Sequence, residues 1–200
     1  MFKTFVNTFP NLSTDIYQKI DLYYTLLKKW NQSHNLVQHR TLILTEFEMR
    51  HLIDSWQLIS HFNKSQTILD IGSGAGIPGI FLAIAGFDVH LVELDKNKAA
   101  FLKNCKATLN LSCTIHSIDV YSISDPYQQV TSRAFSALTD LLKIQKNVSR
   151  ETVGIYPKGE NYLHEIHKAH EVWDFDVTIS SSISSKEGRI LRITNLKHKH

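Results

Sequence analysis

The segment from Asp70 to Gly79, with the sequence DIGSGAGIPG, constrains the fold of this chain more than any other feature. A short apolar run at 67–71 precedes the glycines and is typical of a buried strand. Residues 78–85 are predicted to form a helix, because proline is tolerated in a first helical turn. Glycines allow a sharp turn and the close approach of a ligand, since they carry no Cβ. In open α/β sheets, ligands bind beside the carboxyl ends of the strands. The segment therefore predicts a ligand-binding turn between a strand and a helix.

The spacing Gly74-x-Gly76-x-x-Gly79 matches the fingerprint of dinucleotide-binding turns. Glu93 lies at the predicted end of the second strand, where a carboxylate can accept hydrogen bonds from ribose hydroxyls. This pattern predicts a nucleoside-bearing cofactor and leaves both NAD and S-adenosylmethionine open. Two details favour S-adenosylmethionine. The Asp70 carboxylate suits a cofactor with an ammonium and a sulfonium, and Pro78 removes an N–H group that a pyrophosphate would use.

Strands alternate with helices from residue 66 onward, which predicts an α/β fold with a mostly parallel sheet covered by helices on both faces. The last two strands have no helix between them, so we expect that pair to be antiparallel. The predicted strands are 67–71, 89–94, 114–118, 130–134, 152–156, 175–179 and 189–194. The predicted helices of this part are 78–85, 96–109, 138–148 and 161–172.

Residues 1–65 are predicted to form a helical extension packed on the core of residues 66–200, with one domain overall. The first helix begins at Ser13 or Thr14, whose hydroxyl can cap it. A second helix is expected over 42–62. An apolar stripe on the first helix can be buried only against the rest of the protein. Its members follow one another at helical spacing: Ile16, Ile20, Tyr23, Leu27 and Trp30.

Composition and residue spacing argue against several classes of protein. The 200 residues are 42% hydrophobic and 20% charged, which is typical of a globular protein. Cys105 and Cys113 lack the spacing of a zinc site, and a metal at His164, His167 and His170 is not expected because no close acids or thiols join them. No apolar stretch approaches the roughly 20 residues that span a bilayer. We expect a cytoplasmic monomer with no membrane partner. The net charge of +3 permits a nucleic-acid partner without requiring one.

Several short motifs occur in an order that resembles one family. The D-x-G-x-G-x-G pattern at Asp70–Gly76 resembles the first motif of class I methyltransferases, and the wider set resembles the bacterial 16S rRNA guanine-N7 methyltransferases called RsmG or GidB. Val37 and Lys96 depart from that family's pattern, and the region after Gly159 matches little of it. The matching segments are Trp30-Asn31 with Asn35-Leu36, Arg50–Ser55, Gly72–Gly79, Lys98–Leu102, Ser132–Ala134 and Lys158-Gly159.

The resemblance implies a Rossmann-like class I methyltransferase fold with a seven-stranded sheet, the cofactor S-adenosylmethionine and the partner 16S rRNA in the small ribosomal subunit. Carried over by position, Gly72 and Ile77 contact the cofactor through the backbone, and Glu93 binds its ribose. The complete implied cofactor set is Gly72, Gly74, Gly76, Ile77, Glu93, Ile118, Asp119 and Arg133. Ile118 and Asp119 frame the adenine, and Arg133 lies where cofactor and substrate meet. The implied RNA contacts are Asn35, His51, Arg133 and Lys158.

The implied chemistry needs no general acid or base. Guanine N7 carries a free lone pair, so its methylation removes no proton. We therefore expect catalysis by holding N7 in line with the methyl carbon, on a guanine accessible in single-stranded RNA. The alternatives are a methyltransferase for another RNA or a small molecule, an NAD-dependent oxidoreductase, and an RNA-binding protein without catalysis.

Overall fold

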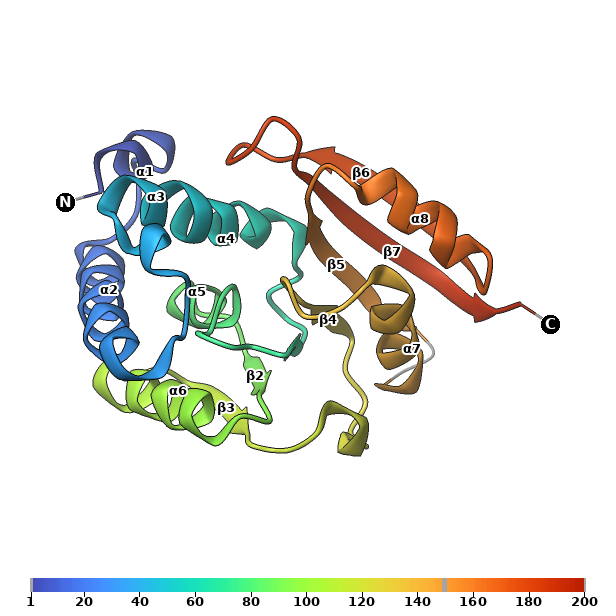
Figure 1. The fold of residues 1–200 in the computed structure, drawn as a ribbon, viewed down its shortest axis with the longest axis horizontal. Helices are drawn as coiled ribbons and strands as arrows, with labels where there is room; N and C mark the ends of the chain where they lie inside the picture. Colours follow the sequence, from blue (N-terminus) through green and yellow to red (C-terminus); the bar gives the residue numbers. More distant parts are fainter. Residues whose placement is uncertain (1, 149–150, 200) are drawn as a thin grey trace.

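The computed structural model describes residues 2–148 and 151–199. Its centre is a seven-stranded sheet in the order β3-β2-β1-β4-β5-β7-β6 (Figure 1). Strands β1 to β5 pair in parallel, and β7 runs antiparallel between β5 and β6. The predicted mostly parallel sheet and antiparallel final pair are both confirmed. The strands are β1 (Ile68–Ile71), β2 (Val89–Val92), β3 (Cys113–His116), β4 (Gln129–Thr131), β5 (Val153–Lys158), β6 (Trp173–Ser181) and β7 (Arg189–His198).

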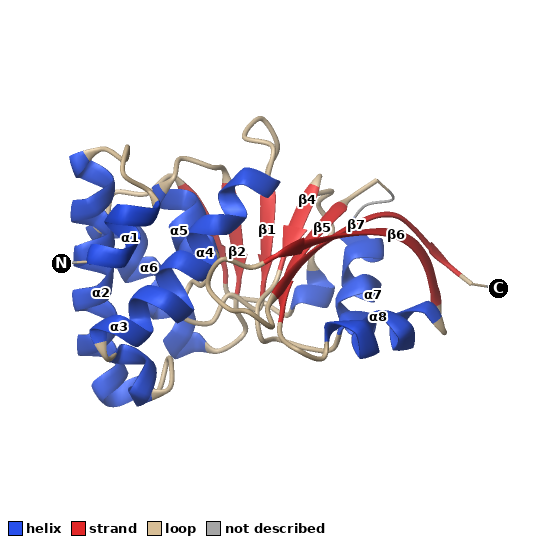
Figure 2. Ribbon diagram, turned by 90° about the horizontal axis from the view of Figure 1, so that it is seen from above, coloured by secondary structure: helices blue, strands red, loops and turns tan. Residues whose placement is uncertain are grey.

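Helices lie on both sides of the sheet, as Figure 2 shows. One hydrophobic cluster joins the N-terminal helices, α5 (Gly79–Ile84) and α6 (Lys96–Thr108) to one side of the sheet. A second cluster joins α7 (Leu138–Val148) and α8 (Tyr162–His170) to the other. A 3-10 turn, η4 (Val120–Ser122), follows β3. Within the described residues, no helix is both long enough and apolar enough to cross a bilayer.

The helical extension forms an outer layer. Helix α2 (Thr14–His34) begins at the Ser13 cap and packs on α5 and α6. The predicted stripe is confirmed: Ile20, Tyr23 and Leu27 are buried, and the two outer members pack against the same cluster. The Tyr23 hydroxyl donates a hydrogen bond to the Ala75 carbonyl at 2.7 Å. The extension therefore supports the glycine turn directly.

The second predicted helix, 42–62, is wrong as a single α-helix. The chain changes its helical pitch along this segment because its residues meet tertiary partners that a local pattern does not show. The elements are η1 (His39–Leu42), α3 (Leu44–Phe47), the π-helical turn η2 (Glu48–Ile53), α4 (Asp54–Trp56) and η3 (Gln57–His61).

Other boundaries also differ from expectation. A short first helix, α1 (Lys3–Thr8), was not predicted; it buries Phe5, whose backbone N–H donates to the Glu48 carboxylate. Strand β3 ends at His116, so Ile118 lies in the loop that follows rather than in the strand. Strands β6 and β7 are longer than predicted because they pair with each other along most of their lengths.

Candidate cofactor and substrate site

The glycine turn adopts backbone angles that favour glycine. The φ angles of Gly72, Gly74 and Gly76 are +64°, +57° and +83°. The Ser73 backbone N–H donates to the Val92 carbonyl at 2.9 Å, which fixes the turn to β2. A Cβ on Gly74 would have only the Gly72 carbonyl oxygen nearby, at 3.9 Å, so this side of the turn is open. The turn thus offers the uncovered backbone that a cofactor can approach.

Alanine substitutions in the glycine turn should distinguish two costs: backbone strain from a left-handed φ, and a steric clash of the added Cβ. Gly74→Ala places a Cβ in open space at a left-handed φ, so it should lower the free energy of unfolding by roughly 1–2 kcal/mol. Gly72→Ala should lower it further, because its Cβ would lie 2.1 Å from the Phe135 ring. Gly159→Ala is the matched control, since a Cβ there meets nothing within 4 Å. Urea unfolding measures all three variants. Equal stabilities for the Gly72 and Gly74 variants would contradict this account of the turn.

Asp70 supports the turn from behind. Its side chain is fully buried, and Oδ2 accepts a hydrogen bond from the Gly79 backbone N–H at 3.1 Å. The Asp70 carboxyl group therefore holds the start of α5, and its preference for a cofactor with an ammonium and a sulfonium stays a prediction. Burial raises the pKa of Asp70 to about 7, although hydrogen bonds from Ser73 and Gly79 and the charge of Arg133 act in the opposite direction.

The raised pKa of Asp70 predicts a pH-dependent stability. Between about pH 4 and pH 7, the unfolded chain releases the Asp70 proton while the folded chain keeps it. Stability should therefore fall as pH rises through this window, by on the order of 4 kcal/mol in total. Asp70→Asn should remove this component, so the difference in unfolding free energy between variant and parent should change with pH. Urea unfolding of both proteins from pH 4.5 to pH 8 tests this; parallel curves would refute it.

Glu93 follows β2 and is held against the turn. Only 8% of the residue is exposed, and its two carboxylate oxygens accept from the backbone N–H groups of Gly74 and Asp95, each at 2.8 Å. Each carboxylate oxygen has a further lone pair, so the group can still accept a hydroxyl proton. The structure fixes the orientation of this acid, and its contact with a ribose stays a prediction.

Exposed apolar side chains follow the ends of β2 and β3. Ile118 is 38% exposed, as expected for a residue that faces a ligand. Leu94 is 65% exposed and was not predicted, although its place directly after the strand-end acid was a usable signal. Asp119 accepts from the Tyr121 backbone N–H at 3.0 Å and so caps η4. Ile77 is buried, and its backbone N–H donates to the Ser73 carbonyl inside the turn.

Arg133 follows β4 and is clamped by the helical extension. Its Nη1 donates to the Arg50 carbonyl and to Asp54 Oδ2, the latter at 3.0 Å, and its Nη2 lies 2.8 Å from His51 Nδ1. A guanidinium only donates, so His51 Nδ1 is the acceptor and the ring proton resides on Nε2. That nitrogen lies 2.9 Å from Thr41 Oγ1. Burial and the Arg133 charge lower the pKa of His51 to about 3, so the ring is neutral and positions the arginine.

A large groove opens beside Arg133. Its volume is about 920 Å³, and its walls come from the helical extension, the segment after β4, the end of β5 and the β6–β7 connection. Gln57 Nε2 donates to Ser182 Oγ at 3.0 Å, and Asp54 Oδ1 accepts from Ser184 Oγ at 2.6 Å. The β6–β7 connection is thus tied to the extension. The basic side chains that line the groove are Arg40, Arg50, Arg133, Lys158, Lys186 and Arg189.

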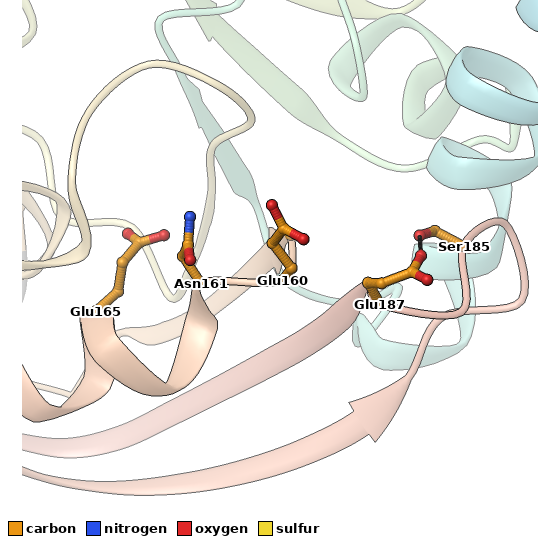
Figure 3. Close-up of a pocket in the computed structure, with 6 residues that line it drawn as sticks. Glu160, Asn161, Glu165, Ser185 and Glu187 are labelled. Carbon is orange, nitrogen blue, oxygen red and sulfur yellow. Dashed lines mark hydrogen bonds between the residues drawn. The ribbon is translucent and has the colours of Figure 1, made fainter.

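Lys158 lines this groove but already has a partner. Its Nζ lies 2.7 Å from Glu165 Oε2, and 9% of its side chain is exposed. An adjoining cavity of about 460 Å³ is acidic, and Figure 3 shows that Glu160 in the turn before α8, Glu165 of α8 and Glu187 of the β6–β7 connection all line it. Direct contact of Lys158 with RNA therefore stays a prediction, with Glu165 as the competing partner.

Asn35 does not join the other predicted RNA contacts. His51, Arg133 and Lys158 line the groove, whereas Asn35 is not part of its lining. Asn35 follows α2 with a φ of +42°, and asparagine tolerates this left-handed position at a helix end.

Among the residues that the structure describes, no group of three or more His, Cys, Asp or Glu side chains is arranged to hold a metal ion.

The sheet order, the open glycine turn and the acid after β2 together define the class I methyltransferase fold. Solved structures share the fold. A magnesium protoporphyrin IX methyltransferase from Synechocystis PCC 6803 matches with a TM-score of 0.57 at 14% identity, covering 92% of this chain and 98% of its own. A ribosomal protein L11 methylase from Lactobacillus delbrueckii subsp. bulgaricus matches with a TM-score of 0.57 at 16% identity, covering 78% and 80%.

The particular family follows from the sequence as a whole. The GidB family model, described as rRNA small subunit methyltransferase G, matches residues 16–194. The protein of that name from Rickettsia akari is 40% identical over 187 residues, covering 92% of this chain and 97% of its own. The one from Rickettsia typhi is 41% identical over 185 residues, covering 92% and 96%. The chain belongs to the GidB family and is an S-adenosylmethionine-dependent methyltransferase, which confirms the resemblance and the predicted cofactor.

Proposed function

We propose that this protein transfers a methyl group from S-adenosylmethionine to N7 of a guanosine in 16S rRNA. The observation that carries the proposal is membership of the GidB family over nearly the whole chain. The groove beside Arg133 supports it, because its lining holds six lysine and arginine side chains against four acidic ones, and lysine and arginine bind RNA phosphates. Its partner would be the small ribosomal subunit or its RNA, and we propose that it acts in the cytoplasm as a monomer.

The residues at the turn fit the cofactor. The open side of Gly74 leaves room for a ligand, Glu93 offers oriented acceptors to a ribose, and the exposed side chains of Leu94 and Ile118 offer an apolar surface to adenine. When bound, S-adenosylmethionine supplies an electrophilic methyl group on a sulfonium. Asp119 lies in the same region, and its carboxylate can accept from an adenine amino group.

The chain's own residues act by binding and orientation. Arg133 is held in one direction by three acceptors from the helical extension, so it can fix an anionic group at the border of turn and groove. His51 stays neutral and keeps that arginine in place. Methylation of N7 removes no proton, so no residue is assigned as general acid or base. Alignment of the reacting atoms is the catalytic contribution that we propose.

Methyl transfer from labelled S-adenosylmethionine tests the proposal. The substrates are small subunits and naked 16S rRNA from cells that lack this methylation, with large-subunit RNA as the control. Nucleoside analysis after digestion should show label in 7-methylguanosine from the small-subunit RNA only. Label in another nucleoside, or in large-subunit RNA alone, would contradict the proposed substrate. Saturable NAD binding without S-adenosylmethionine binding would contradict the cofactor as well.

A further inference from the structure

Phe135 forms the border between the glycine turn and the groove. Its ring packs on the Cα of Gly72, since a Cβ there would lie 2.1 Å from ring atom Cδ2. The adjacent residues Ala134 and Ser136 line the groove. The ring is nevertheless 47% exposed, an unusual state for a large apolar side chain. A flat apolar surface is therefore offered where the expected cofactor and substrate sites meet.

The local backbone is fixed so as to present this ring. Ser132 Oγ donates to the Ile71 carbonyl at 2.8 Å, which ties the end of β4 to β1. Arg133 is clamped by its three acceptors in the helical extension. Ala134 has a φ of +54°, a left-handed conformation that costs a non-glycine residue roughly 1–2 kcal/mol. Strain of this kind persists where the surroundings enforce it, and it is concentrated at functional sites.

We propose that the face of the Phe135 ring stacks on the target guanine and stabilises the positive charge that develops on it. This inference rests on the proposed function. In the reaction, the N7 lone pair forms the new nitrogen–carbon bond, and the sulfur–methyl bond breaks with its electron pair left on sulfur. One positive charge passes from sulfur to the purine, and no proton moves. The face of an aromatic ring carries negative charge and attracts a cation, so the stack is stronger with the methylated base than with guanine.

Such a contact acts on the chemical step. Stacking of a base on an aromatic side chain contributes to binding before and after the reaction. The added attraction for the cationic purine exists only as methyl transfer proceeds, so it raises kcat rather than lowering KM alone. Tyr121 is a matched control: it is a 56% exposed aromatic side chain on η4, and its ring is covered by Lys143 Nζ at 5.8 Å from the centroid.

Substitution of Phe135 tests the inference. Phe135→Leu should lower kcat by roughly 3- to 10-fold through loss of the cation attraction, and it should lower kcat/KM further because stacking on the base is also lost. Phe135→Trp should retain activity within several-fold, because it keeps the aromatic face, and Tyr121→Leu should leave kcat unchanged. Calorimetric affinity for S-adenosylmethionine should stay within about 3-fold of the parent in all three variants, since the ring contacts the turn without supplying a hydrogen bond.

A binding measurement separates stacking from a structural role. The probes are two short oligonucleotides that differ only in guanosine or 7-methylguanosine, bound in the presence of S-adenosylhomocysteine. The parent should prefer the methylated, cationic base by roughly 3- to 10-fold, as expected from a cation–aromatic attraction of about 1 kcal/mol. Phe135→Leu should abolish this preference, and Phe135→Trp should keep it.

The outcomes are distinct. Unchanged kcat in Phe135→Leu, or a preference for the methylated base that survives it, would overturn the stacking role. Equal losses of kcat and cofactor affinity in the Leu and Trp variants would also overturn it and assign the ring to support of the turn. Failure of the parent to form 7-methylguanosine would instead refute the proposed function, because that result does not depend on Phe135.

Discussion

Replacing Glu93 by alanine is expected to weaken S-adenosylmethionine binding by roughly 30- to 150-fold, the value of losing charge-assisted hydrogen bonds of about 2–3 kcal/mol. The predicted ribose acceptor would be lost. The backbone N–H groups of Gly74 and Asp95 would also lose the carboxylate that orders them. Calorimetric titration measures the dissociation constant directly.

Two variants serve as comparisons for this result. Glu93→Gln keeps one oxygen acceptor and should bind with intermediate affinity. Glu171→Ala removes an exposed acid at the end of α8 that pairs with Lys168, and should bind normally. If Glu93→Ala binds as tightly as the parent while folded by circular dichroism, the cofactor does not lie against this acid.

Loss of the Arg133 guanidinium is expected to lower the rate of methyl transfer by roughly 100- to 1,000-fold, the range for removal of a preorganised donor. The group is directed by the Arg50 carbonyl, Asp54 and His51, so its position depends on the forked shape. Arg133→Lys should therefore be nearly as impaired as Arg133→Ala, although it keeps the charge. Single-turnover kinetics with saturating cofactor measures the effect.

The control for this experiment is Arg192→Ala. Arg192 is an exposed arginine on β7 that does not line the groove, so its loss should leave the rate unchanged. A fully active Arg133→Lys variant would show that charge alone is needed at this position. The three acceptors in the helical extension would then stabilise the fold without orienting the cation for methyl transfer.

Local sequence patterns predicted most of the fold. Helix α7 begins and ends at the predicted residues, and the glycine turn lies where its spacing placed it. Such features depend on neighbours along the chain, which a sequence shows. The short helix α1 was missed because its six residues have little helical preference of their own and depend on burial of Phe5.

The sequence predicted the residues of the site better than it predicted the contacts between them. Arg133 and His51 were both expected at the substrate side, but their contact joins positions 82 residues apart. The pairing of Lys158 with Glu165 and the burial of Asp70 were likewise invisible, because both depend on how the finished sheet and helices pack. A motif indicates which residue types a site needs, and tertiary packing decides which of their atoms remain free.

The bonds from Gln57 to Ser182 and from Asp54 to Ser184 carry a consequence for synthesis of the protein. A nascent chain that ends at α7 already contains every residue expected to hold the methyl donor, from Gly72 to Arg133. The far wall of the groove is translated last and must find partners near the beginning of the chain. The donor pocket can therefore be complete before the groove is, and recognition of the acceptor requires the β6–β7 connection.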